Sequence, residues 1–226
     1  MSEQNPQCPV CGSSQTRPWG RDLRDCPACG HAFQWPAVVE VVYDAGYVGE
    51  RYDSYPTTPA MAHLRVGLLA AFVPARLPVG RRSRILDVGY GNGAFVKAAL
   101  SAGYDAAGFD IHGADYGIPT VSECLQPDGW DAVCCFDSLE HIPCLDEMRA
   151  VLRSAGAAVI AVPNRPGWFP YVDRPWKHHR PGEHLHYFSE ASLTRLVGRR
   201  VRLITTVESA IRGGDADGAS VVTYVF

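Results

Sequence analysis

A short apolar strand followed by a glycine-rich turn and a helix constrains the fold more than any other stretch of this chain. Residues 84–93 read R-I-L-D-V-G-Y-G-N-G, and residues 94–100 (A-F-V-K-A-A-L) have helical composition. Glycine stands at every second position of the turn, where a Cβ would hold a ligand away from the backbone. A strand, a glycine turn and a helix in this order predict an α/β sheet that binds a ligand against main chain.

An acidic residue follows at the distance expected for a nucleoside ligand. Asp110 ends a second apolar segment, and a carboxylate at the tip of the next strand can accept both hydroxyls of an adenosine ribose. The spacing D-x-G-x-G-x-G differs from the dinucleotide pattern G-x-G-x-x-G. D-V-G-Y-G-N-G followed by Asp110 resembles the first motif of class I S-adenosylmethionine (SAM) methyltransferases. A glycine turn that only joins a strand to a helix is the simpler alternative.

The resemblance implies that SAM is the cofactor and where it binds. The implied binding residues lie in the first motif, at the tip of the second strand and at the end of the fourth: Asp87, Gly89, Gly91, Gly93, Asp110, Phe136 and Asp137. Tyr90 departs from the family, which often has a small residue or cysteine there. We expect its side chain to point away from the ligand.

The order of apolar segments predicts a doubly wound α/β sheet. Seven strands are expected, within residues 85–88, 106–110, 118–121, 130–136, 156–162, 201–207 and 220–226. Helical patterns lie between most of them, and another covers residues 60–77. Ser189 is the expected cap of the helix that follows it. The fold class is therefore a seven-stranded Rossmann-like methyltransferase sheet, whose final strand could run antiparallel. Arg65 in the helix at 60–77 could reach a ligand carboxylate, but we interpret it as exposed.

The N-terminal segment carries two copies of C-P-x-C-G. Its four thiols, Cys8, Cys11, Cys26 and Cys29, have the spacing of a tetrahedral structural zinc site. Residues 1–35 are too few to build a core, so the metal would supply folding energy. Rubredoxin-like iron and disulfides are the alternatives. The module resembles a zinc ribbon, and because it has no basic surplus we favour a structural or lid-like role over nucleic-acid docking.

Three regions are therefore predicted: a zinc ribbon at 1–35, a tyrosine-rich connector at 36–59 and a class I methyltransferase domain at 60–226. The connector holds four tyrosines: Tyr43, Tyr47, Tyr52 and Tyr55. In the resembled family, a tyrosine-bearing segment before the first helix often folds over SAM and the acceptor. Plain packing between domains is the alternative.

The acceptor is expected beside two segments at the carboxyl ends of the strands. D-S-L-E-H-I at 137–142 resembles the motif after strand four of the family, and the proline-broken stretch 163–188 is long enough to be functional. We favour His184 or His186 as the general base, oriented by Glu183, with His141 as a third candidate. The alternative is that these histidines only cap turns and pack loops. An H-x-H metal site is conceivable, but no carboxylate cluster completes it.

Three cations of the same stretch, Arg174, Lys177 and Arg180, could hold an anionic group of the acceptor, although loop cations are commonly just hydrated.

Composition sets the broad class. The chain has 226 residues and a net charge of −3, which favours neither nucleic acid nor an anionic membrane as partner. The first residues show no signal-peptide pattern, no apolar run is long enough to span a membrane, and paired cysteines fit a reducing cytoplasm. We therefore predict a cytoplasmic SAM-dependent methyltransferase that acts on oxygen, carbon or nitrogen of a small metabolite, such as a sugar or biosynthetic intermediate. Its rivals are a methyltransferase for nucleic acid or protein and a non-catalytic SAM-binding module.

Overall fold

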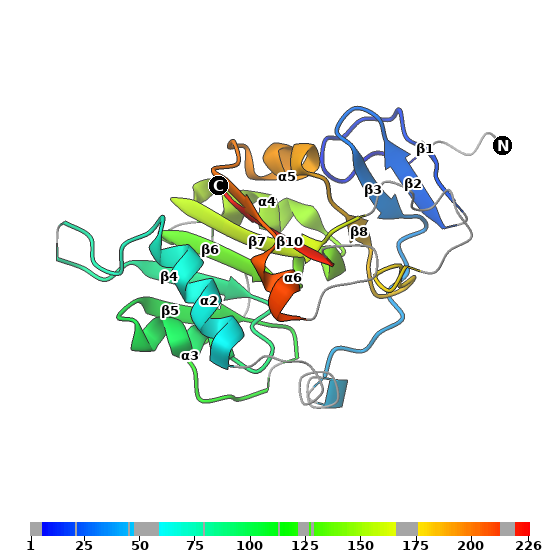
Figure 1. Ribbon diagram of the computed structural model, residues 1–226. Coiled ribbons are helices and arrows are strands. Elements are labelled where there is room, and N and C mark those ends of the chain that lie inside the picture. Colours follow the sequence, from blue (N-terminus) through cyan, green and yellow to red (C-terminus); the bar gives the residue numbers. More distant parts are fainter. Residues whose placement is uncertain are drawn as a thin grey trace.

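A sheet of six strands with helices on both faces forms the body of the molecule, and a small sheet bearing the cysteines lies at one end (Figure 1). The computed structural model describes residues 6–20, 22–44, 46–47, 59–78, 80–112, 114–121, 127, 129–165, 176–212 and 220–226. In spatial order the large sheet contains β5 (Asp105–Phe109), β4 (Arg84–Val88), β6 (Ala132–Phe136), β7 (Ala157–Pro163), β10 (Val221–Val225) and β9 (Leu203–Thr205). The strands β5, β4, β6 and β7 run parallel, and β10 is antiparallel to both neighbours.

This topology confirms the doubly wound α/β fold and the antiparallel final strand. The predicted strand at 118–121 was wrong in extent, because in the described residues it forms only an isolated parallel bridge between Gly108 and Thr120. Two hydrogen bonds hold it, from Gly108 N to the Pro119 carbonyl and from Val121 N to the Gly108 carbonyl. Pro119 has no N–H to extend the ladder.

The helices divide between the two faces of the sheet. The helices α2 (Pro59–Ala70) and α3 (Ala94–Ser101) pack together on one face, and α4 (Leu145–Ser154) and α5 (Glu190–Val197) pack together on the other. Two shorter helices, η1 (Leu139–His141) and α6 (Val207–Ile211), lie near the carboxyl end of β6 and beside β10. None of the helices in the described part of the chain has the length and apolarity needed to cross a membrane.

Period-two alternation along the strands supplies both cores. Ile85 and Cys134 point into the cluster under α2 and α3, whereas Leu86 and Cys135 point into the cluster under α4 and α5. Strands buried on both faces need apolar residues on both, as the all-buried β6 and β7 show. Ser189 caps α5 by accepting from Ser192 N, as predicted. The helix predicted at 60–77 is shorter, since α2 ends at Ala70, before Pro74.

The small sheet combines three strands of the N-terminal cysteine segment with one strand of the predicted acceptor stretch. Its strands are β1 (Arg17–Pro18), β2 (Leu23–Cys26), β3 (His31–Gln34) and β8 (His186–Tyr187), and all pair antiparallel. The strand β8 belongs to the predicted acceptor stretch, so a cysteine-bearing hairpin and that stretch form one sheet (Figure 1). Arg149 of α4 also donates to the carbonyls of Pro9 and Val10. The three-region division of the chain stays a prediction.

Candidate active site

The glycine turn sits where β4 ends and α3 begins, and its conformation excludes side chains. Gly89 has a φ of +79°, and a Cβ there would lie 2.4 Å from the Cβ of Ser138, in the segment after β6. Gly93 has a φ of +74° and caps α3. A left-handed backbone and a close neighbour together require glycine at position 89. The turn therefore lies directly against the segment that follows β6.

Asp110 follows β5 and lies against the same turn. Its Oδ2 accepts from Gly91 N at 3.0 Å, and its Oδ1 accepts from His112 N at 3.3 Å. His112 in turn lies 3.0 Å from the Gly91 carbonyl through Nε2. Its Nδ1 accepts from Ala114 N, so Nε2 carries the proton that it donates to Gly91. This network places the Asp110 carboxylate beside the glycine turn, where the sequence predicted it.

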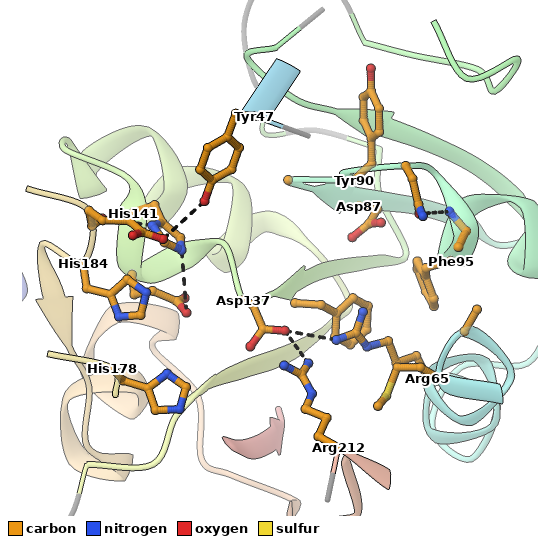
Figure 2. A pocket seen from close by; sticks show the side chains of 18 of the residues that line it. Tyr47, Arg65, Asp87, Tyr90, Phe95, Asp137, His141, His178, His184 and Arg212 are labelled. Atoms are coloured by element: carbon orange, nitrogen blue, oxygen red, sulfur yellow. Dashed lines mark hydrogen bonds and ion pairs between the residues drawn. The ribbon is translucent and has the colours of Figure 1, made fainter. Parts of the chain in front are cut away.

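Tyr90 points away from the space in front of the turn, as expected. Its ring packs over Gly108, where a Cβ would come within 2.4 Å of the ring, and its hydroxyl donates to the Ala114 carbonyl. Figure 2 shows the ring directed away from Asp87.

Asp87 is a buried carboxylate at the end of β4. It is 2% exposed, and its Oδ1 has no hydrogen-bond partner in the described structure. Burial raises the pKa of Asp87 to about 7, against the opposing field of Arg65. A buried polar oxygen without a partner is costly, and a ligand that donates a hydrogen bond would satisfy it.

Asp137, directly after β6, is held by two arginines. Its backbone has a φ of 55°, unusual for a residue with a side chain. Arg65 reaches its Oδ2 at 3.3 Å, and Arg212 contacts the same oxygen (Figure 2). Burial alone would raise the pKa of Asp137, but Arg212 and Arg65 outweigh it and hold the pKa below its usual range. The carboxylate is therefore charged and fixed in place.

The prediction that Arg65 is exposed was wrong. Arg65 is 9% exposed, and its guanidinium donates two hydrogen bonds to Glu208, at 3.2 Å and 2.8 Å. Glu208 is fully buried on α6, so it needs a cation at this point. Arg212 and Glu208 are the residues here that the sequence did not single out; their only signal was their i,i+4 spacing.

Three side chains meet on the other side of Asp137. Glu140 and His141 come from η1, and His184 comes from the predicted acceptor stretch. The His141 and His184 rings lie 4.7 Å apart and nearly perpendicular. A backbone bond from Leu185 N to the Glu140 carbonyl ties the two segments together. Burial lowers the pKa of His184 to about 2 and that of His141 below its ordinary value, and it raises that of Glu140 well above.

Glu183 orients His141 through its backbone. The His141 Nδ1 lies 2.9 Å from the Glu183 carbonyl and 3.0 Å from the Tyr43 hydroxyl. A carbonyl can only accept, so Nδ1 carries the proton and Nε2 keeps its lone pair. The Glu183 carboxylate accepts from the Tyr47 hydroxyl at 3.2 Å and from Arg180 at 3.0 Å.

His186 lies elsewhere, on β8 of the small sheet, where it contacts the end of η1. Its Nδ1 is 3.1 Å from His31 Nε2, and its Nε2 donates to the Ile142 carbonyl at 2.9 Å. Both ring nitrogens therefore have partners, and burial lowers the pKa of His186 to about 4. Of the predicted catalytic residues, His141, Glu183 and His184 lie together, whereas His186 holds the small sheet against η1.

Two adjoining hollows open at the carboxyl ends of the strands. One is lined by Val88, Phe109, Asp110, Ser138 and Met148, among others. The other is lined by Asp87, Arg65, Phe95, Phe136, Glu140, His184 and Arg212, among others (Figure 2). Gly89, Asp137, His141 and Tyr47 line both. A single elongated ligand could therefore pass from the first hollow into the second across Gly89.

The predicted metal residues lie together. The Cys8 and Cys29 sulfurs are 3.6 Å apart, and those of Cys11 and Cys26 are 3.5 Å apart. All four sulfurs lie within 4.8 Å of one another. Four thiolates about 2.3 Å from one zinc ion would be about 3.8 Å apart, so the arrangement fits such an ion. Hydrogen bonding between the two thiols lowers the pKa of Cys8 to about 5 and raises that of Cys29, as for two sulfurs that share one proton.

Some predicted residues lie outside the described part of the chain, and of the predicted anion-binding cations only Lys177 and Arg180 lie within it. Arg174 and the connector tyrosines Tyr52 and Tyr55 lie outside. Arg180 lines the second hollow and pairs with Glu183, whereas the Lys177 side chain is not among the lining groups.

The fold and the site define a class of protein: an α/β sheet whose glycine turn, strand-tip carboxylate and post-β6 segment surround a binding crevice. Residues 61–200 match the methyltransferase domain family, and the chain belongs to that family. The chain is 28% identical over 116 residues to a ubiquinone biosynthesis O-methyltransferase from Xylella fastidiosa (strain 9a5c). That match covers 42% of this chain and 47% of the relative, so the chain spans about half the length of the curated relative.

Solved structures share the fold at low sequence identity. A SAM-dependent methyltransferase from Archaeoglobus fulgidus superposes with a TM-score of 0.54 at 14% identity, over 80% of this chain and 99% of that one. The Burkholderia thailandensis 1,6-didemethyltoxoflavin-N1-methyltransferase, solved with 1,6-didemethyltoxoflavin and S-adenosylhomocysteine, superposes with a TM-score of 0.53 at 18% identity. This match covers 91% of this chain and 98% of that one.

Proposed function

We propose that this protein transfers the methyl group of SAM to a small-molecule acceptor. The observation that carries the proposal is the pair of hollows that meet at Gly89, Asp137 and His141. A methyltransferase needs a donor site and an acceptor site that share one point, because methyl transfer is an in-line displacement at the sulfonium carbon.

The first hollow suits the adenosine part of SAM. Asp110 stands at its rim with a carboxylate that can accept from the ribose hydroxyls, and Phe109 and Met148 supply apolar walls for the base. Gly89 and Gly91 let the ligand touch main chain. The methionine part would pass Gly89 into the second hollow, where the unpartnered Oδ1 of Asp87 would receive its α-ammonium group. Of the other predicted donor residues, Phe136 lines the second hollow and Asp137 lines both, whereas Gly93 caps α3.

The part of the second hollow around His141 and His184 suits the acceptor. SAM supplies an electrophilic methyl group, and an oxygen, nitrogen or carbon acceptor must lose a proton to receive it. His141 and His184 with Glu140 line this hollow, and Glu183 orients His141, so we assign loss of the proton to this cluster. Arg180 could pair with an anionic group of the acceptor. We assign His186 a structural role.

Two comparisons support a small acceptor. The curated relative is named for ubiquinone biosynthesis, and the Burkholderia protein was solved with a small heterocycle. Tyr47 from the connector lines both hollows, and its hydroxyl donates to Glu183. Its side chain therefore leaves less room for a macromolecular acceptor to reach the hollows.

The cysteine cluster would hold a structural zinc ion, which positions the acceptor side of the site. The pairing of β3 with β8 and the bond from Gln34 N to the Leu185 carbonyl connect the ribbon to His184. Replacing Cys26 by serine should remove zinc from the purified protein and increase amide exchange at residues 184–187. Zinc loss with unchanged exchange there would contradict the positioning role.

The function is tested with SAM carrying a tritiated methyl group. Candidate acceptors are hydroxylated aromatics, sugars and carboxylates, with transfer RNA and total protein offered in parallel. Incorporation into a small molecule supports the proposal. Incorporation only into RNA or protein would overturn the small-acceptor assignment, and SAM binding without any transfer would favour a binding module.

A further inference from the structure

Glu140, His141 and His184 form a second group of potential metal ligands, separate from the four cysteines. One carboxylate oxygen of Glu140 and one nitrogen of each histidine lie within 4.8 Å of one another. The sequence predicts no histidine metal site because no carboxylate cluster completes H-x-H. The structure corrects that argument: the carboxylate comes from η1, and only the first histidine of H-x-H takes part.

Unsatisfied buried atoms point to a missing partner at this cluster. Glu140 is 1% exposed, and its Oε2 has no hydrogen-bond partner in the described structure. His184 is 4% exposed, and its Nδ1 is likewise without one. Buried polar atoms normally have partners, and two orphaned atoms in one cluster are accounted for by a single cation.

His141 is already oriented as a metal ligand. Its Nδ1 proton is donated to the Glu183 carbonyl, which leaves the Nε2 lone pair on the side of Glu140, 4.0 Å from Oε1. Metal-binding histidines commonly donate their other ring N–H to a carbonyl in this way, which fixes the tautomer. The Leu185–Glu140 backbone bond holds the two ligand-bearing segments together without the ion.

We propose that Glu140, His141 and His184 bind a divalent cation that holds and activates the acceptor of the proposed methyl transfer. Two imidazoles and one carboxylate favour ions such as Zn²⁺, Mn²⁺, Co²⁺ or Fe²⁺ over Mg²⁺ or Ca²⁺. Ligand atoms about 2.1 Å from one tetrahedral ion lie about 3.4 Å apart, so atoms that now lie within 4.8 Å of one another must close by at most about 1.4 Å.

Three protein ligands leave coordination positions open toward the hollow. These positions suit an acceptor that carries a hydroxyl beside a second oxygen, such as a 1,2-dihydroxy aromatic or an α-hydroxy acid. With both imidazoles bound to the cation, neither accepts the proton; the cation instead lowers the pKa of the hydroxyl, and its proton leaves to solvent. The acceptor oxygen then forms a bond to the methyl carbon while the carbon–sulfur bond breaks. The electron pair of that bond stays on sulfur, which gives neutral S-adenosylhomocysteine. This acceptor chemistry rests on the proposed function, whereas the cation site does not.

Manganese titration of the zinc-loaded, full-length protein tests the site. Loss of the free Mn²⁺ signal in electron paramagnetic resonance reports binding, and thiolates of the ribbon are poor ligands for this hard ion. We expect one Mn²⁺ per chain and at least tenfold weaker binding in Glu140→Gln and in His184→Gln. The matched control is His63→Gln, since His63 is exposed on α2 and should leave Mn²⁺ affinity unchanged.

Calorimetry of SAM binding, run on every variant, separates the outcomes. Weak Mn²⁺ binding with wild-type SAM affinity in Glu140→Gln and His184→Gln supports the cation site in a folded protein. Wild-type protein that binds SAM but no Mn²⁺, or equal Mn²⁺ affinity in all variants, would overturn the cation site and leave the proposed function standing. If one of the two variants also loses SAM binding, the variant that still binds SAM provides the test. Wild-type Mn²⁺ affinity in that variant would contradict the cation site.

Discussion

Replacing Gly89 by alanine should damage both stability and SAM binding. The left-handed backbone at a φ of +79° costs a side-chain-bearing residue about 1–2 kcal/mol. The new Cβ would lie 2.4 Å from the Cβ of Ser138, and relieving such overpacking typically costs about 1–3 kcal/mol. Ser138 also donates to the Val88 carbonyl, so it cannot move without loss. The total destabilisation is about 2–5 kcal/mol, and the displaced turn should bind SAM more weakly.

Gly103→Ala separates the two contributions. Gly103 has a φ of +92°, and a Cβ there would meet nothing within 4 Å, so this variant carries only the backbone cost of about 1–2 kcal/mol. Urea unfolding followed by circular dichroism gives both free energies, and calorimetry gives both SAM affinities. Gly103→Ala should bind SAM like the wild type. The reasoning is refuted if Gly89→Ala loses no more stability than Gly103→Ala and binds SAM equally well.

Two further substitutions probe the buried charges of the site. The pKa of Asp87 is raised to about 7, so the folded protein binds more protons than the unfolded chain between the usual carboxyl pKa and 7, and stability without ligand falls as the pH rises through that range. Asp87→Asn should therefore stabilise the ligand-free protein by about 2–4 kcal/mol at pH 8 and hardly at pH 4. It should also weaken SAM binding. Thermal unfolding measured at both pH values checks the stability change, and equal stabilities of variant and wild type at pH 8 would contradict it. Arg65→Ala removes the bidentate partner of buried Glu208 but leaves Arg212 on its Oε2 at 2.9 Å, so it should cost about 1–3 kcal/mol in urea unfolding. Arg17→Ala, which breaks an exposed pair, should cost under about 1 kcal/mol.

The parts of the site that the sequence predicts are those set by local pattern. The glycine turn follows from the residues between one strand and one helix. Asp110 follows because parallel strands end at the same edge of the sheet. The direction of the Tyr90 side chain could be predicted because the residue lies between two turn glycines and can point away from the ligand.

The remaining parts depend on contacts between distant segments, which no local pattern encodes. His31 and His186 are 155 positions apart and meet only because β3 pairs with β8. That pairing is the basis for our proposal that His186 has a structural role. Arg65 was judged exposed because its partner Glu208, 143 positions away, has no recognisable motif. Glu140 and His184 are likewise far apart in the sequence. The hydrogen bond from Leu185 N to the Glu140 carbonyl brings their segments together.

The proposed activity requires that SAM bind at the glycine turn with its ribose on Asp110. Calorimetric titration of S-adenosylhomocysteine into the wild type and Asp110→Asn measures this most directly. We expect one site per chain in the wild type and at least tenfold weaker binding in the variant, because a charged acceptor of two ribose hydroxyls becomes neutral. Equal affinities, or a wild-type protein that does not bind the compound, would contradict the account.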